Sequence, residues 1–267
     1  MGLALESIVT SAVNPGAGPT AFTTAVSGDT LTVRNFTPSS YAKLIQLTRR
    51  GATQGFIRVR SPLLHDNVRG IMITTGQTPS LFAMPEQVSQ NLYAQDTLIV
   101  EGSGGGAETD LGILLIYYAD MPGVTSRLHM RGDYEGLVKN IKPITVAVTT
   151  SATIGQWTDT ALTATEDLLH ANTDYAIIGF ITSAAIGWVA VKGPETNNFR
   201  VGGPGSVNVE STGDYFASQS DYHGIPMVPV FNAANKNGIV VSTVDSAAST
   251  AATITLICAE LSQNLPN

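Results

Sequence analysis

The sequence is poor in the residues that most catalytic and metal-binding sites require. It contains one cysteine, Cys258, so the chain cannot form an internal disulfide, which fits assembly in a reducing cytoplasm. Because Cys258 alternates with Ile254 and Leu256, we expect it to be a small buried side chain. Charged residues make up 13% of the chain, against about 25% in typical domains. Such a surface favours a protein that packs against neighbours, although a neutral secreted β-protein has the same composition.

Few candidates for catalysis or metal binding exist in this chain. Its histidines are too dispersed to resemble the converging ligands of a cupin-type barrel: His65, His129, His170 and His223. No catalytic motif surrounds a serine or another nucleophile in this sequence. The two carboxylates of a glycosidase have no fixed spacing along a chain, and nothing in this sequence points to such a pair. The GSGGG run at Gly102 leads into Ala107 and Glu108 instead of a lysine and a hydroxyl, which argues against a phosphate loop and for a hairpin connection. We therefore expect no enzyme, no catalytic residues, no metal and no cofactor.

Long apolar runs are also missing. No stretch of about 18 uncharged apolar residues occurs, as a membrane-spanning helix would require. The first residues, MGLALESIVTSAV, lack the basic segment of a secretory signal. We therefore expect neither a membrane span nor an export signal.

One stretch of the sequence occurs twice. GFIRVRSPLLHDNVRG begins at Gly55, and GWVAVKGPETNNFRVG begins at Gly187. Aligning them matches glycine, aromatic, aliphatic and proline positions in order: Phe56 with Trp188, Val59 with Val191, and Pro62 with Pro194. Weaker matches extend both ways, among them Ile99 and Val100 with Ile239 and Val240. Two long copies indicate a tandem duplication, since solenoid repeats run about 20–50 residues.

The duplication divides the chain into two similar halves. We expect a first half of residues 1–121, a linker of residues 122–142 that is helical in part, and a second half of residues 143–267. Each half shows about eight short runs of alternating apolar residues separated by glycine-rich turns, the number of strands in a jelly roll. The fold class we predict is all-β, with two tandem eight-stranded jelly rolls.

Charge is divided unevenly between the halves. Residues 1–120 hold seven basic and nine acidic residues, whereas residues 144–267 hold three and ten. A surplus of seven acids makes the second half a poor partner for a phosphate backbone. The first half carries a set of basic residues that are candidates for a contact between subunits, with only Asp66 among them to oppose the charge: Lys43, Arg49, Arg50, Arg58, Arg60 and Arg69. The basic face can meet the acidic half of a neighbour, or it is an ordinary solvated strand face.

With these features the chain resembles the double jelly-roll major capsid proteins of tailless icosahedral viruses, the lineage of tectiviruses, corticoviruses and adenoviruses. The resemblance covers the whole chain and rests on duplicated architecture and size, because that lineage has no diagnostic motif. It implies homotrimers that form pseudo-hexameric capsomers of an icosahedral bacteriophage capsid.

The resemblance also implies a set of partners and a location. The partners are the chain itself, other virion proteins such as a penton, and an internal membrane surface, without sequence-specific binding to nucleic acid. The location is the virion, assembled in the host cytoplasm. The alternative interpretation is a tandem β-sandwich that binds carbohydrate or forms a viral spike.

Overall fold

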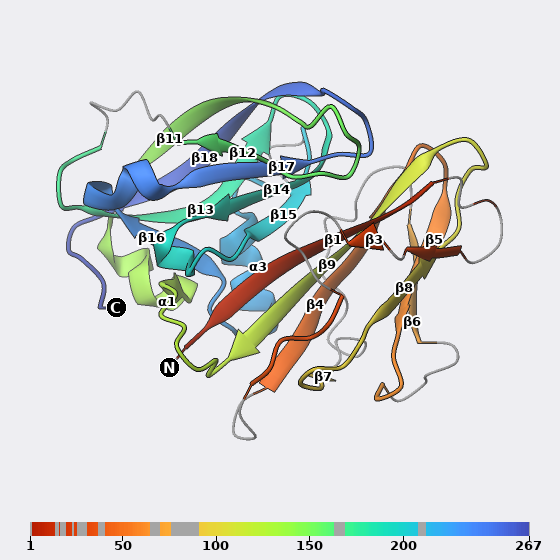
Figure 1. Cartoon of the computed structure of the whole chain (residues 1–267). Helices are drawn as coiled ribbons and strands as arrows, with labels where there is room; N and C mark the ends of the chain where they lie inside the picture. Colours follow the sequence, from red (N-terminus) through yellow and green to blue (C-terminus); the bar gives the residue numbers. More distant parts are fainter. Residues whose placement is uncertain are drawn as a thin grey trace.

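The computed structural model describes residues 2–13, 16, 20–22, 24–25, 31–36, 41–64, 70–75, 91–162, 169–207 and 212–266. Within them the regular structure is mostly β-strand, arranged in four sheets (Figure 1). This confirms the expected all-β class. No helix in the described part of the chain is long and apolar enough to cross a membrane.

The first half contains two facing sheets. Its strands are β1 (Ala4–Val13), β2 (Thr20–Phe22), β3 (Thr24–Ala25), β4 (Tyr41–Arg50), β5 (Gly55–Arg60), β6 (Ile71–Thr75), β7 (Asn91–Leu92), β8 (Ile99–Gly102) and β9 (Thr109–Ala119). One sheet has the order β3-β1-β9-β4-β7, and the other has the order β2-β8-β5-β6. Apolar side chains from both sheets, such as Ile8, Leu114 and Val59, fill the space between them.

The second half also contains two facing sheets. Its strands are β11 (Val138–Thr149), β12 (Thr158–Ala161), β13 (Asp174–Thr182), β14 (Ile186–Lys192), β15 (Val201–Gly205), β16 (Val228–Asn232), β17 (Val240–Val244) and β18 (Ala251–Leu261). The sheet orders are β10-β16-β13-β18-β11 and β12-β17-β14-β15, where β10 is Leu128–His129. Short 3-10 turns occur at Glu135–Leu137, Pro194–Thr196 and Ala233–Gly238.

The two halves share one strand order. Apart from the short edge strands β3 and β10, the pattern β1-β9-β4-β7 corresponds to β11-β18-β13-β16, and β2-β8-β5-β6 corresponds to β12-β17-β14-β15. Each half thus places its first, eighth, third and sixth strands in one sheet and its second, seventh, fourth and fifth strands in the other. Two such four-stranded sheets are of the jelly-roll type.

Strand pairing refines the alignment of the two halves. The stretches that begin at Gly55 and Gly187 form β5 and β14, which hold the same place in their sheets. Val59 lies opposite Val100, and the matching Val191 lies opposite Val241. Matching Val100 with Val240, as the sequence suggested, is therefore wrong by one residue. Both halves have a bulge in the third strand, after Leu44 in β4 and after Ile177 in β13.

The bridge between the halves belongs structurally with the second half. Its β10 pairs with β16, and its helix α1 (Arg131–Tyr134) contacts the longer helix α3 (Tyr215–His223) through the ion pair between Arg131 and Asp221. Strand β11 already begins at Val138. Helix α3 was not expected from the sequence.

Candidate functional site

The largest apolar contact outside the two sandwich cores joins the halves to each other. The outer face of a sheet is here the face turned away from its own sandwich. In the first half the outer face of β1, β9 and β4 carries buried apolar side chains that belong to the core cluster of the second half: Leu5, Val9, Ile45, Leu111, Ile113, Leu115 and Tyr117. They lie against the sheet edge formed by β15 (Figure 1). We call this contact the inter-half interface.

Polar groups fix the register of the inter-half interface. The indole Nε1 of Trp188 donates to Ser7 Oγ at 2.9 Å, and the Ser7 amide donates to the Arg200 carbonyl at 2.9 Å. On the other side of β15, the Tyr215 hydroxyl donates to Gln46 Oε1 at 2.5 Å. Because buried polar groups need partners, these bonds hold the two halves in one relative orientation.

The second half does not cover its own equivalent face. On the outer face of β11 and β18 the residues opposite one another are Pro143 with Ile257, Thr145 with Thr255, and Ala147 with Thr253. Those on β11 are exposed, whereas the corresponding first-half positions Leu5, Ser7 and Val9 are fully buried. The duplication therefore leaves one copy of this face open within the chain.

Arg49 lies in the interior and is removed from the candidate subunit contact. Its side chain is 0% exposed and pairs with Asp110 at 2.5 Å and with Glu108 at 3.1 Å. Glu108 also accepts from the amides of Ala52 and Thr53 at 2.6 and 2.9 Å. A side chain enclosed in this way has no surface to offer a neighbour.

The glycine-rich run beside this ion pair has a packing role. A Cβ atom at Gly104 would overlap the Arg49 guanidinium and the Asp110 carboxylate, so only glycine fits. The run connects β8 and β9, which lie in different sheets, so it is not the hairpin expected from the sequence.

Two other members of the basic set contact the second half of their own chain. Arg50 pairs with Asp245 at 3.3 Å across the inter-half interface. Lys43 lies near His223 on α3. Burial, and to a smaller extent the charge of Lys43, lower the pKa of His223 to about 4. For Arg50 the acidic partner is therefore Asp245 of its own chain, whereas the prediction placed that partner in a neighbouring chain.

Arg58 and Arg60 remain at the surface of the first half. Both guanidinium groups contact Glu101, at 2.6 Å and 3.0 Å, and their side chains are 22% and 30% exposed. The hydrogen bond with Glu101 raises the pKa of Arg60. The pKa of Glu101 is lowered, because its hydrogen bonds with the two arginines outweigh the effect of burial. The last member of the set, Arg69, lies outside the described residues.

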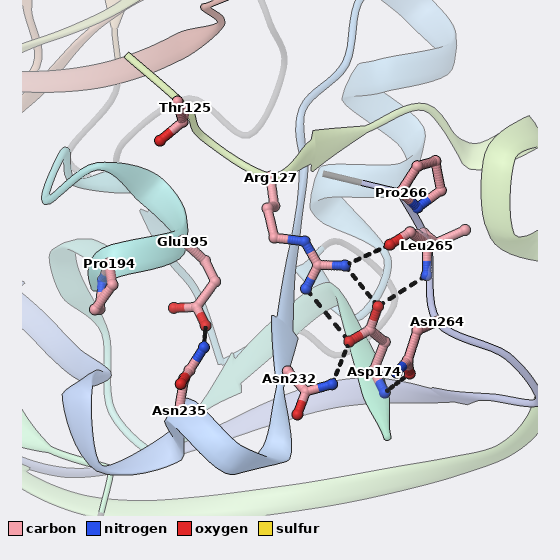
Figure 2. Close-up of a pocket in the computed structure, with 10 residues that line it drawn as sticks. All are labelled: Thr125, Arg127, Asp174, Pro194, Glu195, Asn232, Asn235, Asn264, Leu265 and Pro266. Atoms are coloured by element: carbon pink, nitrogen blue, oxygen red, sulfur yellow. Dashed lines mark hydrogen bonds and ion pairs between the residues drawn. The ribbon is translucent and has the colours of Figure 1, made fainter. Parts of the chain in front are cut away.

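A pocket of about 720 Å³ lies between the bridge, two 3-10 turns at Pro194 and Asn235, the ends of β13 and β16, and the C-terminal segment (Figure 2). Asp174 is its central group. It accepts from Arg127 Nη2 at 2.6 Å, from Asn232 Nδ2 at 2.8 Å and from the Leu265 amide at 2.9 Å. Arg127 Nη2 also donates to the Leu265 carbonyl at 3.0 Å. This network fastens the bridge and the C-terminal segment to the second half, and sequence analysis did not find it because Arg127 and Leu265 are 138 residues apart.

The Asp174 network predicts a pH-dependent contribution to stability. Burial raises the pKa of Asp174, but the bonds from Arg127, Asn232 and Leu265 outweigh it, so the pKa lies below its usual 3.8. A carboxyl whose folded pKa is depressed stabilises the fold above its unfolded pKa and loses that effect as the pH falls. We expect Asp174→Asn to lower the free energy of unfolding by about 3 kcal/mol at pH 7, because it leaves Arg127 unpaired.

The check is a series of thermal melts of both proteins from pH 3 to pH 7. The difference in melting temperature should be constant above about pH 5 and should shrink below it, because the unfolded wild type then binds a proton at Asp174 more readily than the folded protein does. A difference that grows toward low pH would contradict this assignment.

The structure brings no candidate metal ligands together. In the ranges described above, no group of three or more His, Cys, Asp or Glu side chains is placed to hold a metal ion. His129 and His223 are partly buried, His170 contacts Glu260 at 2.7 Å, and His65 lies outside the described residues. Cys258 is fully buried, and burial raises the pKa of its thiol.

Comparisons with known proteins give only distant likenesses. No family model matches the chain, and no curated protein matches it. Among solved structures, the PBSX exported protein XepA is 8% identical with a TM-score of 0.27, over 96% of this chain and 86% of that chain. A chain from the atomic structure of Sulfolobus turreted icosahedral virus is 11% identical with a TM-score of 0.25, over 98% and 81%. The MCP of that virus is 7% identical with a TM-score of 0.20, over 97% of both chains. Scores this low do not establish a common fold, so the case for function rests on the chain's own contacts.

Proposed function

We propose that the chain is a double jelly roll that builds a viral shell, with three copies forming a pseudo-hexameric capsomer. The observation that carries the proposal is the inter-half interface. It joins unlike surfaces of two like halves, the outer face of the β1 sheet and the β15 edge. Contacts of this head-to-tail kind close into rings when they repeat around an axis.

The repeated strand order supports a ring of similar units. Because each chain supplies two units of one topology, three chains supply six, and hexagonal rings pack side by side in a surface without gaps. The low fraction of charged residues, 13%, suits surfaces that are covered in an assembly. In this proposal the protein is a structural component of the virion, without a catalytic role, whose first partner is another copy of itself. Contacts with a penton or an internal membrane belong to later steps of assembly.

Light scattering of the purified protein on a sizing column tests the proposal. With a chain mass of 28.0 kDa, we expect a species of about 84 kDa, because permanent contacts of roughly 2,000 Å² or more keep subunits together at micromolar concentration. Negative-stain images of the same fraction should show hexagonal outlines. A protein that stays at 28 kDa when concentrated to hundreds of micromolar would contradict the proposed function.

A further inference from the structure

Two surfaces of the molecule correspond to the two sides of the inter-half interface and are not joined to each other. One is the edge of β6, which matches β15 because both strands end the sheet that contains β5 or β14. The other is the outer face of β11 and β18, which matches the covered face of β1 and β9. Strands β6 and β11 lie on opposite sides of the molecule (Figure 1), so one chain cannot bring them together.

The β6 edge exposes apolar side chains. Met72 on β6 is 61% exposed and Leu63 in the preceding loop is 51% exposed. Phe56 on the neighbouring β5 is only partly buried, whereas Trp188, its equivalent beside β15, is fully buried. Among the described residues no strand pairs with the outer edge of β6, and a strand edge flanked by exposed apolar groups is a site where another chain readily packs.

The face of β11 and β18 is free of charge. Along its centre the outward residues are Pro143, Thr145, Ala147, Thr149, Ala251, Thr253, Thr255 and Ile257, none of which is ionisable. Solvated strand faces of soluble proteins usually carry lysine or glutamate, which oppose association. In the first half the corresponding face is likewise uncharged, and there it is covered by β15 and its neighbours.

We infer that the outer face of β11 and β18 of one copy docks on the β6 edge of a second copy, which repeats the inter-half interface between chains. The inference rests on the proposed function, since it names the contact that joins subunits of the capsomer. The occupant is a second copy of this chain because its own fold already contains the equivalent contact. Phe56 takes the place of Trp188, and the threonine-rich face takes the place of Leu5, Ser7 and Val9.

The arginines at this surface lie next to the contact. Arg58 is opposite Met72 in the pairing of β5 with β6, and Arg60 follows on the same strand face. Their shared ion pair with Glu101 reduces the charge that docking would desolvate. Arg58 and Arg60 thus stay in the proposed subunit contact as neighbours of an apolar edge, with their charge partly balanced by Glu101.

Paired variants of the two surfaces test the inference. One variant combines Leu63→Arg with Met72→Arg on the β6 edge, and the other combines Thr145→Arg with Ala147→Arg on the β11 face. All four side chains are exposed within one chain, so each variant should fold. We expect each alone to associate at least a hundredfold more weakly than the wild type and to elute as a 28.0 kDa monomer.

The equimolar mixture of the two variants gives the distinctive result. Each variant keeps one intact surface, and the two intact surfaces are complementary, so the mixture should form a dimer of about 56 kDa, twice 28.0 kDa, and no trimer. Gln263→Arg, an exposed position near the C-terminal segment, is the matched control and should leave the wild-type mass unchanged. Thermal melts of each variant confirm that the fold is retained.

The outcomes separate this inference from the proposed function. A wild type that forms trimers while either double variant also forms trimers would overturn the docking surfaces and leave the shell-building proposal standing. A mixture that stays monomeric would overturn the complementary pairing. A wild type that is itself monomeric would overturn the proposed function, and the inference with it.

Discussion

Replacing Arg49 with methionine should lower the free energy of unfolding by about 3–5 kcal/mol at pH 7, since breaking a buried ion pair leaves an uncompensated charge. Among the described residues, Arg49 is the one cation that forms ion pairs with Asp110 and Glu108. Burial, together with the Glu108 charge, raises the pKa of Asp110 to about 6 despite its bond to Arg49. Without the arginine two carboxylates face each other inside the protein.

Urea unfolding followed by circular dichroism measures this loss. A carboxyl whose folded pKa is raised favours the fold in its protonated form, so the deficit of the variant should become smaller as the pH is lowered from 7 to 5. Arg131→Met is the matched control, because Arg131 also contacts two carboxylates, Glu135 and Asp221, but its side chain is 50% exposed. An exposed pair contributes about 0–1 kcal/mol. Equal losses in the two variants would contradict the buried pair.

The same arginine shows why charge counting along the sequence fails. Within the run of basic residues only Asp66 is acidic, which suggested a free basic face. In the structure each of these arginines that is described meets a carboxylate far along the chain, such as Asp110 for Arg49 and Asp245 for Arg50, 61 and 195 residues away. Strand order decides those meetings, and a count over neighbouring positions cannot see it.

Strand positions were predictable because alternation reports burial on one face. The stretches at Gly55 and Gly187 are strands in equivalent places, since both carry the same alternating pattern. The alignment of β8 with its counterpart β17 was wrong by one residue. By residue type, Ile99-Val100 matches Ile239-Val240 and Val240-Val241 about equally well. Helix α3 was missed because its first turn, Tyr215 to Ala217, is buried by contacts with distant strands and shows no helical pattern of its own.

A signal for the inter-half interface was present in the sequence. Strand β9 reads as an almost continuous apolar run, LGILLIYYA, whereas its counterpart β18 alternates polar and apolar residues near its start, in TITL. A continuous run indicates a strand buried on both faces. That difference between corresponding sheets marks which half is covered by the other, and it is independent of any charge argument.

Truncating Trp188 to alanine should have the second large effect, a loss of about 3–5 kcal/mol in the free energy of unfolding. The side chain is 0% exposed at the inter-half interface, and its removal leaves both a cavity and an unpartnered Ser7 hydroxyl. Because the contacts of Trp188 join two separate sandwiches, we expect the single unfolding transition to split into two. Circular dichroism during urea unfolding measures both effects, and an unchanged single transition would contradict the role of Trp188 in coupling the halves.

Phe56→Ala is the matched variant, since Phe56 occupies the equivalent position in the first half. In an isolated chain Phe56 is only partly buried, so its truncation should lower the free energy of unfolding by about 1 kcal/mol. If the second copy docks at the β6 edge, however, Phe56 becomes buried in the assembly, and the variant should dissociate at a concentration where the wild type remains trimeric. The equivalent residues would then have different roles: Trp188 stabilises the fold of the chain, and Phe56 stabilises the assembly of several chains. Truncation of Phe56 that changes neither mass nor stability would place the contact between subunits elsewhere on the molecule.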